Sequence, residues 1–183
     1  METWPSNKRT FRLIVWWYTR CMNAIILASA LLAAPATPEE AVATLWRALS
    51  HDAGQSGDEA TLRAILHPDA MVYGARYRNG AAALSVARGT DFATGIGRAD
   101  EKGFYECEVA REVRQYDRFA TVYSVVESRN ERGAPKANFT GVNSIQLYRA
   151  DDGWRIIGLY YQVERPGQPI SLQGGKPGAC LEG

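Results

Sequence analysis

The spacing of apolar residues changes once along the chain, near Gly103, and this change limits the folds that the sequence allows. Before Gly103, apolar side chains recur every three or four residues, which is typical of amphipathic helices. After it, apolar and polar side chains alternate, which is typical of half-buried strands. Helices followed by strands predict an α+β fold with an antiparallel sheet, because a parallel sheet needs alternating strand and helix units.

Capping residues set the limits of the elements in the first half. Thr37 and Pro38 are typical of a helix start, and Asp58 is placed to cap a second, shorter helix. The predicted elements, in order, are a helix over 37–49, a helix from 58 that ends before Pro68, a strand over 71–73 and a third helix over 81–87, closed by Gly89. Three N-terminal helices are therefore expected to cover the sheet.

The second half predicts four strands, and the last hairpin allows its faces to be assigned. The strands are expected near 104–115, 119–129, 139–149 and 154–164. Pairing across Asp152-Gly153 puts odd-numbered residues of the incoming strand beside even-numbered residues of the outgoing strand. One face then carries Asn143, Trp154, Tyr160, Gln162 and Glu164, and the other carries Ile157, Leu159 and Tyr161. The faces of the strands before Phe139 cannot be assigned in this way.

The two ends of the chain differ from the middle. Residues 1–36 contain basic residues, two apolar runs separated by Arg20 and a small-x-small site at Ala34 to Ala36, which are the parts of a secretory signal peptide. Met22 is an alternative start, and an uncleaved anchor is the alternative to cleavage. We expect an exported protein, periplasmic or secreted, with a folded domain over 37–164. Residues 165–183 are rich in glycine and proline and predict a mobile tail.

Composition excludes several classes of partner. Lys and Arg number 21 and Asp and Glu 20, so no excess of positive charge is present to bind nucleic acid or an anionic membrane. Beyond the leader, the sequence predicts no membrane span. His51 and His67 have no acidic or thiol neighbour at metal-ligand spacing, and no glycine-rich phosphate loop is present. No metal and no cofactor are therefore predicted.

Cysteine placement leaves two readings open. Cys21 would leave with the leader, Cys107 lies in a predicted strand, and Cys180 lies in the tail. In an oxidising compartment, Cys107 and Cys180 could form a disulfide bond. The alternative is a buried core thiol at Cys107 and a free thiol at Cys180.

Several segments resemble the nuclear transport factor 2-like superfamily, including its SnoaL-type polyketide-cyclase-like domains. In the first half these are the capped helix and the run 66–74, and in the second half they are 119–124, 141–147 and 152–156 with a closing Glu164. The resemblance covers 37–164. It implies a cone-shaped domain in which helices and a curved sheet enclose a pocket, often with dimerisation through the sheet. It implies no particular activity, because this fold carries many functions.

Three functions remain open, and the first two have candidate residues. The first is a binding module for a small, largely apolar ligand. Its candidate contacts are Asn143, Tyr160, Gln162 and Trp154, with Arg76 and Tyr77 on a loop where Arg76 could pair with an anionic group. The second is an isomerase, cyclase or dehydratase in which Glu164 or Asp69 takes a proton and Tyr73 or Tyr160 donates one. The third is a scaffold whose interior is filled by side chains.

An apolar second face of the sheet predicts a partner. Ile157, Leu159 and Tyr161 share that face in the assigned hairpin, although a sheet covered on one side should be polar on the other. A homodimer through this face is the economical explanation.

Overall fold

Three helices and six strands are formed by residues 34–181, the part of the chain that the computed structural model describes. The elements are α1 (Pro38–Leu49), α2 (Glu59–Ile65), β1 (Leu66–Arg78), β2 (Ala81–Arg88), α3 (Gly89–Ile96), β3 (Tyr105–Tyr116), β4 (Phe119–Arg129), β5 (Phe139–Ala150) and β6 (Gly153–Val163). All but the last three residues of the predicted leader, 1–36, lie outside the described part. Within 34–181, no helix is long and apolar enough to cross a membrane.

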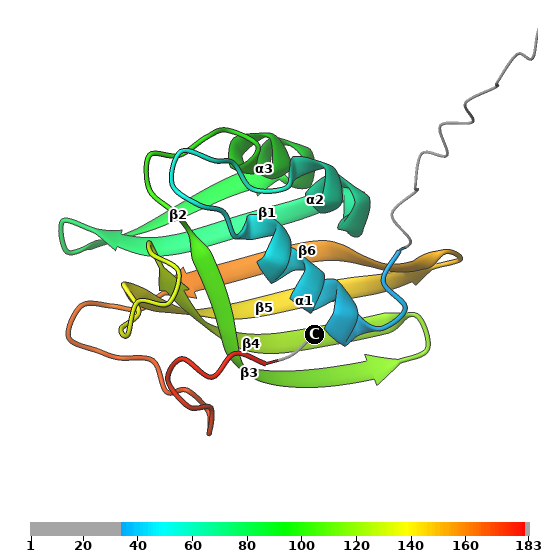
Figure 1. The fold of residues 1–183 in the computed structure, drawn as a ribbon. Helices are drawn as coiled ribbons and strands as arrows, with labels where there is room; N and C mark the ends of the chain where they lie inside the picture. The colour runs from blue at the N-terminus through cyan, green and yellow to red at the C-terminus, as the bar shows by residue number, and fades with distance from the viewer. Residues whose placement is uncertain (1–33, 182–183) are drawn as a thin grey trace, which may run out of the picture. The chain divides into compact units, whose positions relative to one another are not determined.

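The six strands form one mixed sheet in the order β2-β1-β6-β5-β4-β3, and the helices lie on one side of it (Figure 1). The α+β class with helices on a sheet is confirmed. The three pairs of the predicted meander, β3–β4, β4–β5 and β5–β6, are antiparallel as predicted. The pair β1–β2 is antiparallel as well, whereas β1 and β6 run parallel. The parallel pair arises because β1 and β2 form a hairpin of their own. This hairpin adds to the meander β3-β4-β5-β6 at its last strand, β6.

The helix predicted over 81–87 is wrong, because these residues form the strand β2. Asn79 and Gly80 both have positive φ, at 50° and 79°, and they make a two-residue turn that pairs Arg78 with Ala81. Such Asn-Gly turns are typical of β-hairpins. The strand predicted at 71–73 is correspondingly longer, and Gly89 begins α3 instead of ending a helix.

The predicted starts of α1 and α2 are confirmed by their caps. The side-chain oxygen of Thr37 accepts a hydrogen bond from the Glu40 N–H at 3.1 Å, and that of Asp58 accepts one from the Thr61 N–H at 2.9 Å. Behind these caps, the apolar faces of both helices pack on the sheet in one core cluster that includes Leu45, Leu62, Ile145, Ile156 and Leu159. We call the helix-covered side of the sheet the inner face and the opposite side the outer face.

A β-bulge at Ile157 overturns the predicted faces of the last strand. Leu147 pairs with Ile156, but Gln146 pairs with Gly158, so Ile157 is an extra residue without a partner in β5. Because side chains alternate along a strand, one extra residue exchanges the faces of all residues beyond it. Leu159 and Tyr161 therefore lie on the inner face, and Tyr160 lies on the outer face.

The C-terminal segment 165–181, which was predicted as a mobile tail and which we call the strap, lies against the domain. Cys180 forms a disulfide bond with Cys107 on β3, with the two Cα atoms 4.9 Å apart. Ile170 and Leu172 pack against an apolar cluster that includes Val125 on the outer face. Of the two readings left open for the cysteines, the structure shows the disulfide.

Candidate functional site: an inner pocket and its carboxylate

A cavity of about 250 Å³ lies between the inner face of the sheet and the helices α1 and α3, and we call it the inner pocket. Its walls are mainly apolar, with aromatic side chains from several elements. The apolar and aromatic lining consists of Trp46, Leu49, Phe92, Ile96, Phe104, Val126, Phe139, Leu159, Tyr161 and Val163. Five further residues, Arg76, Glu106, Ser128, Gly141 and Asn143, complete the wall. An apolar hollow with a few convergent polar groups is typical of small-molecule sites.

Glu106 on β3 is the one carboxylate among the residues that line the inner pocket. Glu106 lies on the inner face beside Ser128, its partner on β4. The single hydroxyl proton of Ser128 is shared between the two carboxylate oxygens of Glu106, which lie 3.2 and 3.0 Å from Ser128 Oγ. The backbone N–H of Glu106 is bonded to Ser50 Oγ at the end of α1, at 3.0 Å.

Burial raises the pKa of Glu106 to about 7, and the hydrogen bond from Ser128 opposes this shift only in part. The cause is desolvation, because removal from water disfavours the charged form of a carboxyl group. At neutral pH both the acid and the carboxylate are therefore populated. Such a group can donate a hydrogen bond, accept one or exchange a proton with a bound molecule.

Asn143 and Tyr161 face each other across β5 and β6 and supply two further polar groups of the pocket. Asn143 is buried, and its side-chain nitrogen donates to the Ser124 carbonyl oxygen at 3.4 Å. Tyr161 lies over Gly74 of β1, where a Cβ atom would overlap the Tyr161 hydroxyl and ring. Gly74 thus leaves the space in which Tyr161 closes one side of the pocket.

Arg76, at the end of β1, is the cation of the pocket and is exposed. No ion pair of Arg76 occurs with any residue of 34–181. A guanidinium beside an apolar cavity is suited to bind an anionic group of a ligand whose body lies inside.

A second hollow, of about 660 Å³, lies along β3 between α1, the β4–β5 loop and the end of the strap, and we call it the edge groove. Trp46 and Glu106 line both the edge groove and the inner pocket, so these two side chains separate the cavities. The Trp46 indole N–H is buried and has no hydrogen-bond partner among residues 34–181. Because Glu106 lines both hollows, a molecule can approach it from the inner pocket or from the edge groove.

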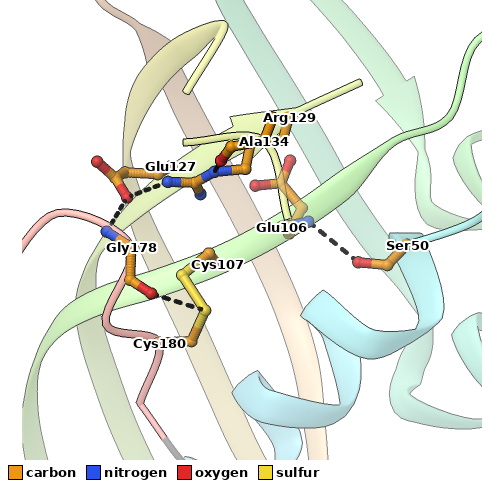
Figure 2. The surroundings of a disulfide bond; sticks show 8 residues. All are labelled: Ser50, Glu106, Cys107, Glu127, Arg129, Ala134, Gly178 and Cys180. Atoms are coloured by element: carbon orange, nitrogen blue, oxygen red, sulfur yellow. Dashed lines mark hydrogen bonds and ion pairs between the residues drawn. A yellow bond between two sulfur atoms is a disulfide. The ribbon is translucent and has the colours of Figure 1, made fainter. Parts of the chain in front are cut away.

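Two buried ion pairs lie beside the groove, and Figure 2 shows one of them next to the disulfide. Arg129 donates to Glu127 at 2.8 Å and to the Ala134 carbonyl oxygen at 3.0 Å, and the Gly178 N–H donates to Glu127 at 2.7 Å. In the other pair, Arg111 contacts Glu108. Both carboxylates keep partners for their charge, unlike Glu106, whose side-chain partner is the neutral Ser128.

Only two of the residues predicted for the site line the inner pocket. Asn143 and Arg76 do so, whereas Trp154 is buried in the core, 1% exposed. The prediction that Asn143, Tyr160 and Glu164 point into one hollow is wrong, because the bulge at Ile157 turns Tyr160 to the outer face. There, Tyr160 is 45% exposed.

The other predicted residues also lie away from the pocket. Gln162 pairs with Val142 on the outer face, and Glu164 follows the last residue of β6. Tyr73 is exposed on the outer face. The guanidinium carbon of Arg165, in the strap, lies over the Tyr77 ring, 5.6 Å from the centre of that ring. Asp69 is exposed, with a carboxylate oxygen 3.8 Å from His67 Nδ1.

The predicted dimer residues divide between the two faces as well. Ile157 is exposed, but Leu159 is 2% exposed in the core and Tyr161 lines the inner pocket. The assignment of Leu159 and Tyr161 to a free face was therefore wrong, again because of the bulge. No group of three potential metal ligands occurs within residues 34–181.

Sequence reasoning missed Glu106, the central polar group of the pocket. The run Glu106-Cys107-Glu108 alternates faces, but no residue pattern indicates which face of β3 is inside. The bulge between Glu108 and Ala110 removes the regular alternation that would have helped.

Comparison with known proteins supports the fold and leaves the activity open. No protein-family model matches the chain, and no curated protein does. A protein of unknown function with a cystatin-like fold from Nostoc punctiforme is 17% identical, with 75% of this chain and 99% of that chain covered and a TM-score of 0.54. A CaMKII hub from S. rosetta is 16% identical, with 71% and 99% covered and a TM-score of 0.52.

A nuclear transport factor 2-like protein from Cytophaga hutchinsonii is similar too, at 14% identity, with 69% of this chain and 94% of that chain covered and a TM-score of 0.50. The domain therefore has the cystatin-like, nuclear transport factor 2-like fold, which confirms the fold that the sequence resemblance implied. At these identities the likeness concerns the fold alone.

Proposed function

We propose that the inner pocket binds a small, largely apolar molecule that carries one polar or anionic group. The observation that supports this most is an unfilled apolar cavity of about 250 Å³ with Glu106, Asn143 and Arg76 in its wall. A pure scaffold would gain stability by filling such a space, because an empty cavity costs packing energy. The apolar body of the ligand lies against the aromatic wall, and its polar group meets Arg76 or Glu106.

Filling the pocket tests this proposal. A Cβ atom on Gly141 would meet only the Gln162 carbonyl oxygen, at 3.6 Å, so Gly141→Leu adds a side chain inside without a backbone clash. The probe is 8-anilinonaphthalene-1-sulfonate, which joins apolar rings to one anionic group. We expect Gly141→Leu to weaken its binding at least about tenfold, the cost of losing apolar contact. Thr140→Val, on the opposite face of the same strand, is the matched control. Equal binding by all three proteins would exclude the pocket as the site.

A second candidate function, proton transfer, is favoured by Glu106 in particular. As a carboxylate it can take a proton from the carbon beside a ligand carbonyl, so that the C–H electron pair passes into an enolate. The acid so formed returns a proton to the same carbon or to another carbon of the enolate. No net oxidation occurs, and no cofactor is needed.

Deuterium exchange tests for this activity. In D₂O, the wild-type protein should speed deuterium incorporation next to the carbonyl of 2-tetralone, followed by NMR, and Glu106→Gln should abolish the acceleration. Glu164→Gln, at the end of β6 outside the pocket, should leave it unchanged. Acceleration that survives in Glu106→Gln would rule out this role for the carboxyl group, while ligand binding would stand.

The outer face supports a homodimer, although Ile157 is the only one of the three predicted residues that lies on it. Nine of the ten large apolar side chains that are exposed in the described residues lie on that face of the sheet: Tyr73, Leu84, Val86, Tyr116, Phe119, Tyr123, Tyr148, Ile157 and Tyr160. A patch of this kind is typical of a surface that is covered in solution. We expect Tyr123→Arg with Tyr160→Arg to give monomers in light scattering, and Leu181→Arg to leave dimers. A wild-type monomer would refute the dimer.

Export of the protein is supported by the disulfide bond. A bond between Cys107 and Cys180 persists in oxidising compartments and is rare in the reducing cytosol. We expect the protein recovered from its host to begin after the leader 1–36 and to contain no free thiol at these positions. Mass spectrometry of the purified protein measures both, and a mass that retains the leader with two free thiols would contradict export.

A further inference from the structure

The strap is held to the domain in two different ways along its length. Its first part, 165–172, is fixed by side-chain packing: Ile170 and Leu172 lie in the apolar cluster of the outer face, and Arg165 lies over the Tyr77 ring. These contacts do not depend on any covalent bond, so we expect this part to stay in place on its own.

The second part, 173–181, is held mainly by the disulfide bond, and its Gly175 also lies close against the Val109 backbone. Within residues 34–181 it makes two hydrogen bonds to residues outside the strap: the Gly178 N–H donates to Glu127 at 2.7 Å, and the Leu181 N–H donates to the Glu108 carbonyl oxygen at 2.7 Å. None of its side chains is buried. Fixing one residue costs about as much free energy as one hydrogen bond returns, so two bonds cannot hold nine residues.

This weakly held end is a wall of the edge groove. Gly178, Cys180 and Leu181 line the groove, opposite residues of α1. The groove is separated from the inner pocket by Trp46 and Glu106. Cys107 and Glu106 are neighbours on β3 and point to opposite faces, so the disulfide anchors the strap one residue from the pocket carboxylate (Figure 2).

We propose that the Cys107–Cys180 disulfide is a redox-operated latch, which holds 173–181 over the edge groove and frees it when a dithiol reduces the bond. Cys180 is exposed and Cys107 is buried, so a reductant thiolate attacks the sulfur of Cys180. The S–S bond breaks, Cys107 leaves as a thiolate and takes a proton, and the second thiol of the reductant displaces Cys180. The reductant ends as a disulfide and both cysteines end as thiols. Release removes one wall of the groove and widens the access to Glu106 on that side.

Hydrogen exchange tests the latch directly. The protein carries Cys21→Ser, so that no third thiol takes part. On reduction with dithiothreitol, or in Cys180→Ser, we expect the amides of Gly178 and Leu181 to exchange at least about 100-fold faster than in the oxidised protein. The Trp46 indole N–H should also exchange faster, because it borders the groove, while the Trp154 indole in the core should not change.

A control variant separates the two parts of the strap. Leu172→Ser should loosen 165–172 and leave Gly178 and Leu181 protected, since the disulfide still holds them. The latch is overturned if these two amides stay protected without the disulfide, or if they exchange freely while it is intact. Neither readout uses a bound ligand. The latch can therefore be refuted while ligand binding in the inner pocket holds, and ligand binding can be refuted while the latch holds.

Discussion

The raised pKa of Glu106 makes a quantitative prediction about stability and pH. In the unfolded chain this carboxyl titrates near 4.5, and in the folded domain burial moves its pKa to about 7. Between these values the unfolded chain has lost the proton while the folded chain retains it. The free energy of unfolding therefore falls as pH rises through this window and levels off above it. A difference of this size corresponds to about 3 kcal/mol, since one pKa unit is 1.36 kcal/mol.

Urea unfolding at several pH values between 4.5 and 8 measures this effect. The stability of the wild-type protein minus that of Glu106→Gln should fall by about 3 kcal/mol across the range, because the amide does not titrate. Ser128→Ala removes the hydrogen bond that stabilises the carboxylate, so its window should extend to higher pH. Parallel profiles for the wild-type protein and Glu106→Gln would show that Glu106 is solvated, and the pocket would then lose its titrating group.

Three further substitutions follow from the packing. Loss of the Cys107–Cys180 bond, which closes a loop with a sequence separation of 73, should destabilise the domain by up to about 4 kcal/mol and lower Tm by about 10 °C in calorimetry, and an unchanged Tm would contradict this. Gly74→Ala should displace Tyr161 and weaken probe binding in fluorescence titrations, and unchanged affinity would count against Tyr161 as a wall of the pocket. Glu127→Ala leaves a buried arginine unpaired and should cost about 3–5 kcal/mol in urea unfolding, whereas a loss below about 1 kcal/mol would show the pair to be solvated.

The fold was predictable wherever local chemistry decided it. Thr37 and Asp58 indicated two helices by their caps, and the alternation after Gly103 indicated four strands. The helix predicted over 81–87 failed because an alanine-rich run is compatible with helix and strand alike. The Asn79-Gly80 turn pairs this run with β1, and the run therefore forms a strand.

The site was less predictable, because it depends on register. A single unpaired residue, Ile157, reverses the faces of Leu159, Tyr160 and Tyr161. The isolated Gly158 beside it is the one sequence feature that indicates a bulge there. Asn143 was placed correctly because it lies on β5, whose alternation is regular. The position of Glu106 depends on pairing between strands, which one sequence cannot supply.

The most direct test of the inner pocket is a crystal structure of the domain with 8-anilinonaphthalene-1-sulfonate bound. We predict the aromatic rings between Trp46, Phe92 and Tyr161, with the sulfonate at Arg76. Density for the probe on the outer face alone, above a pocket filled by shifted side chains, would contradict the proposed binding site.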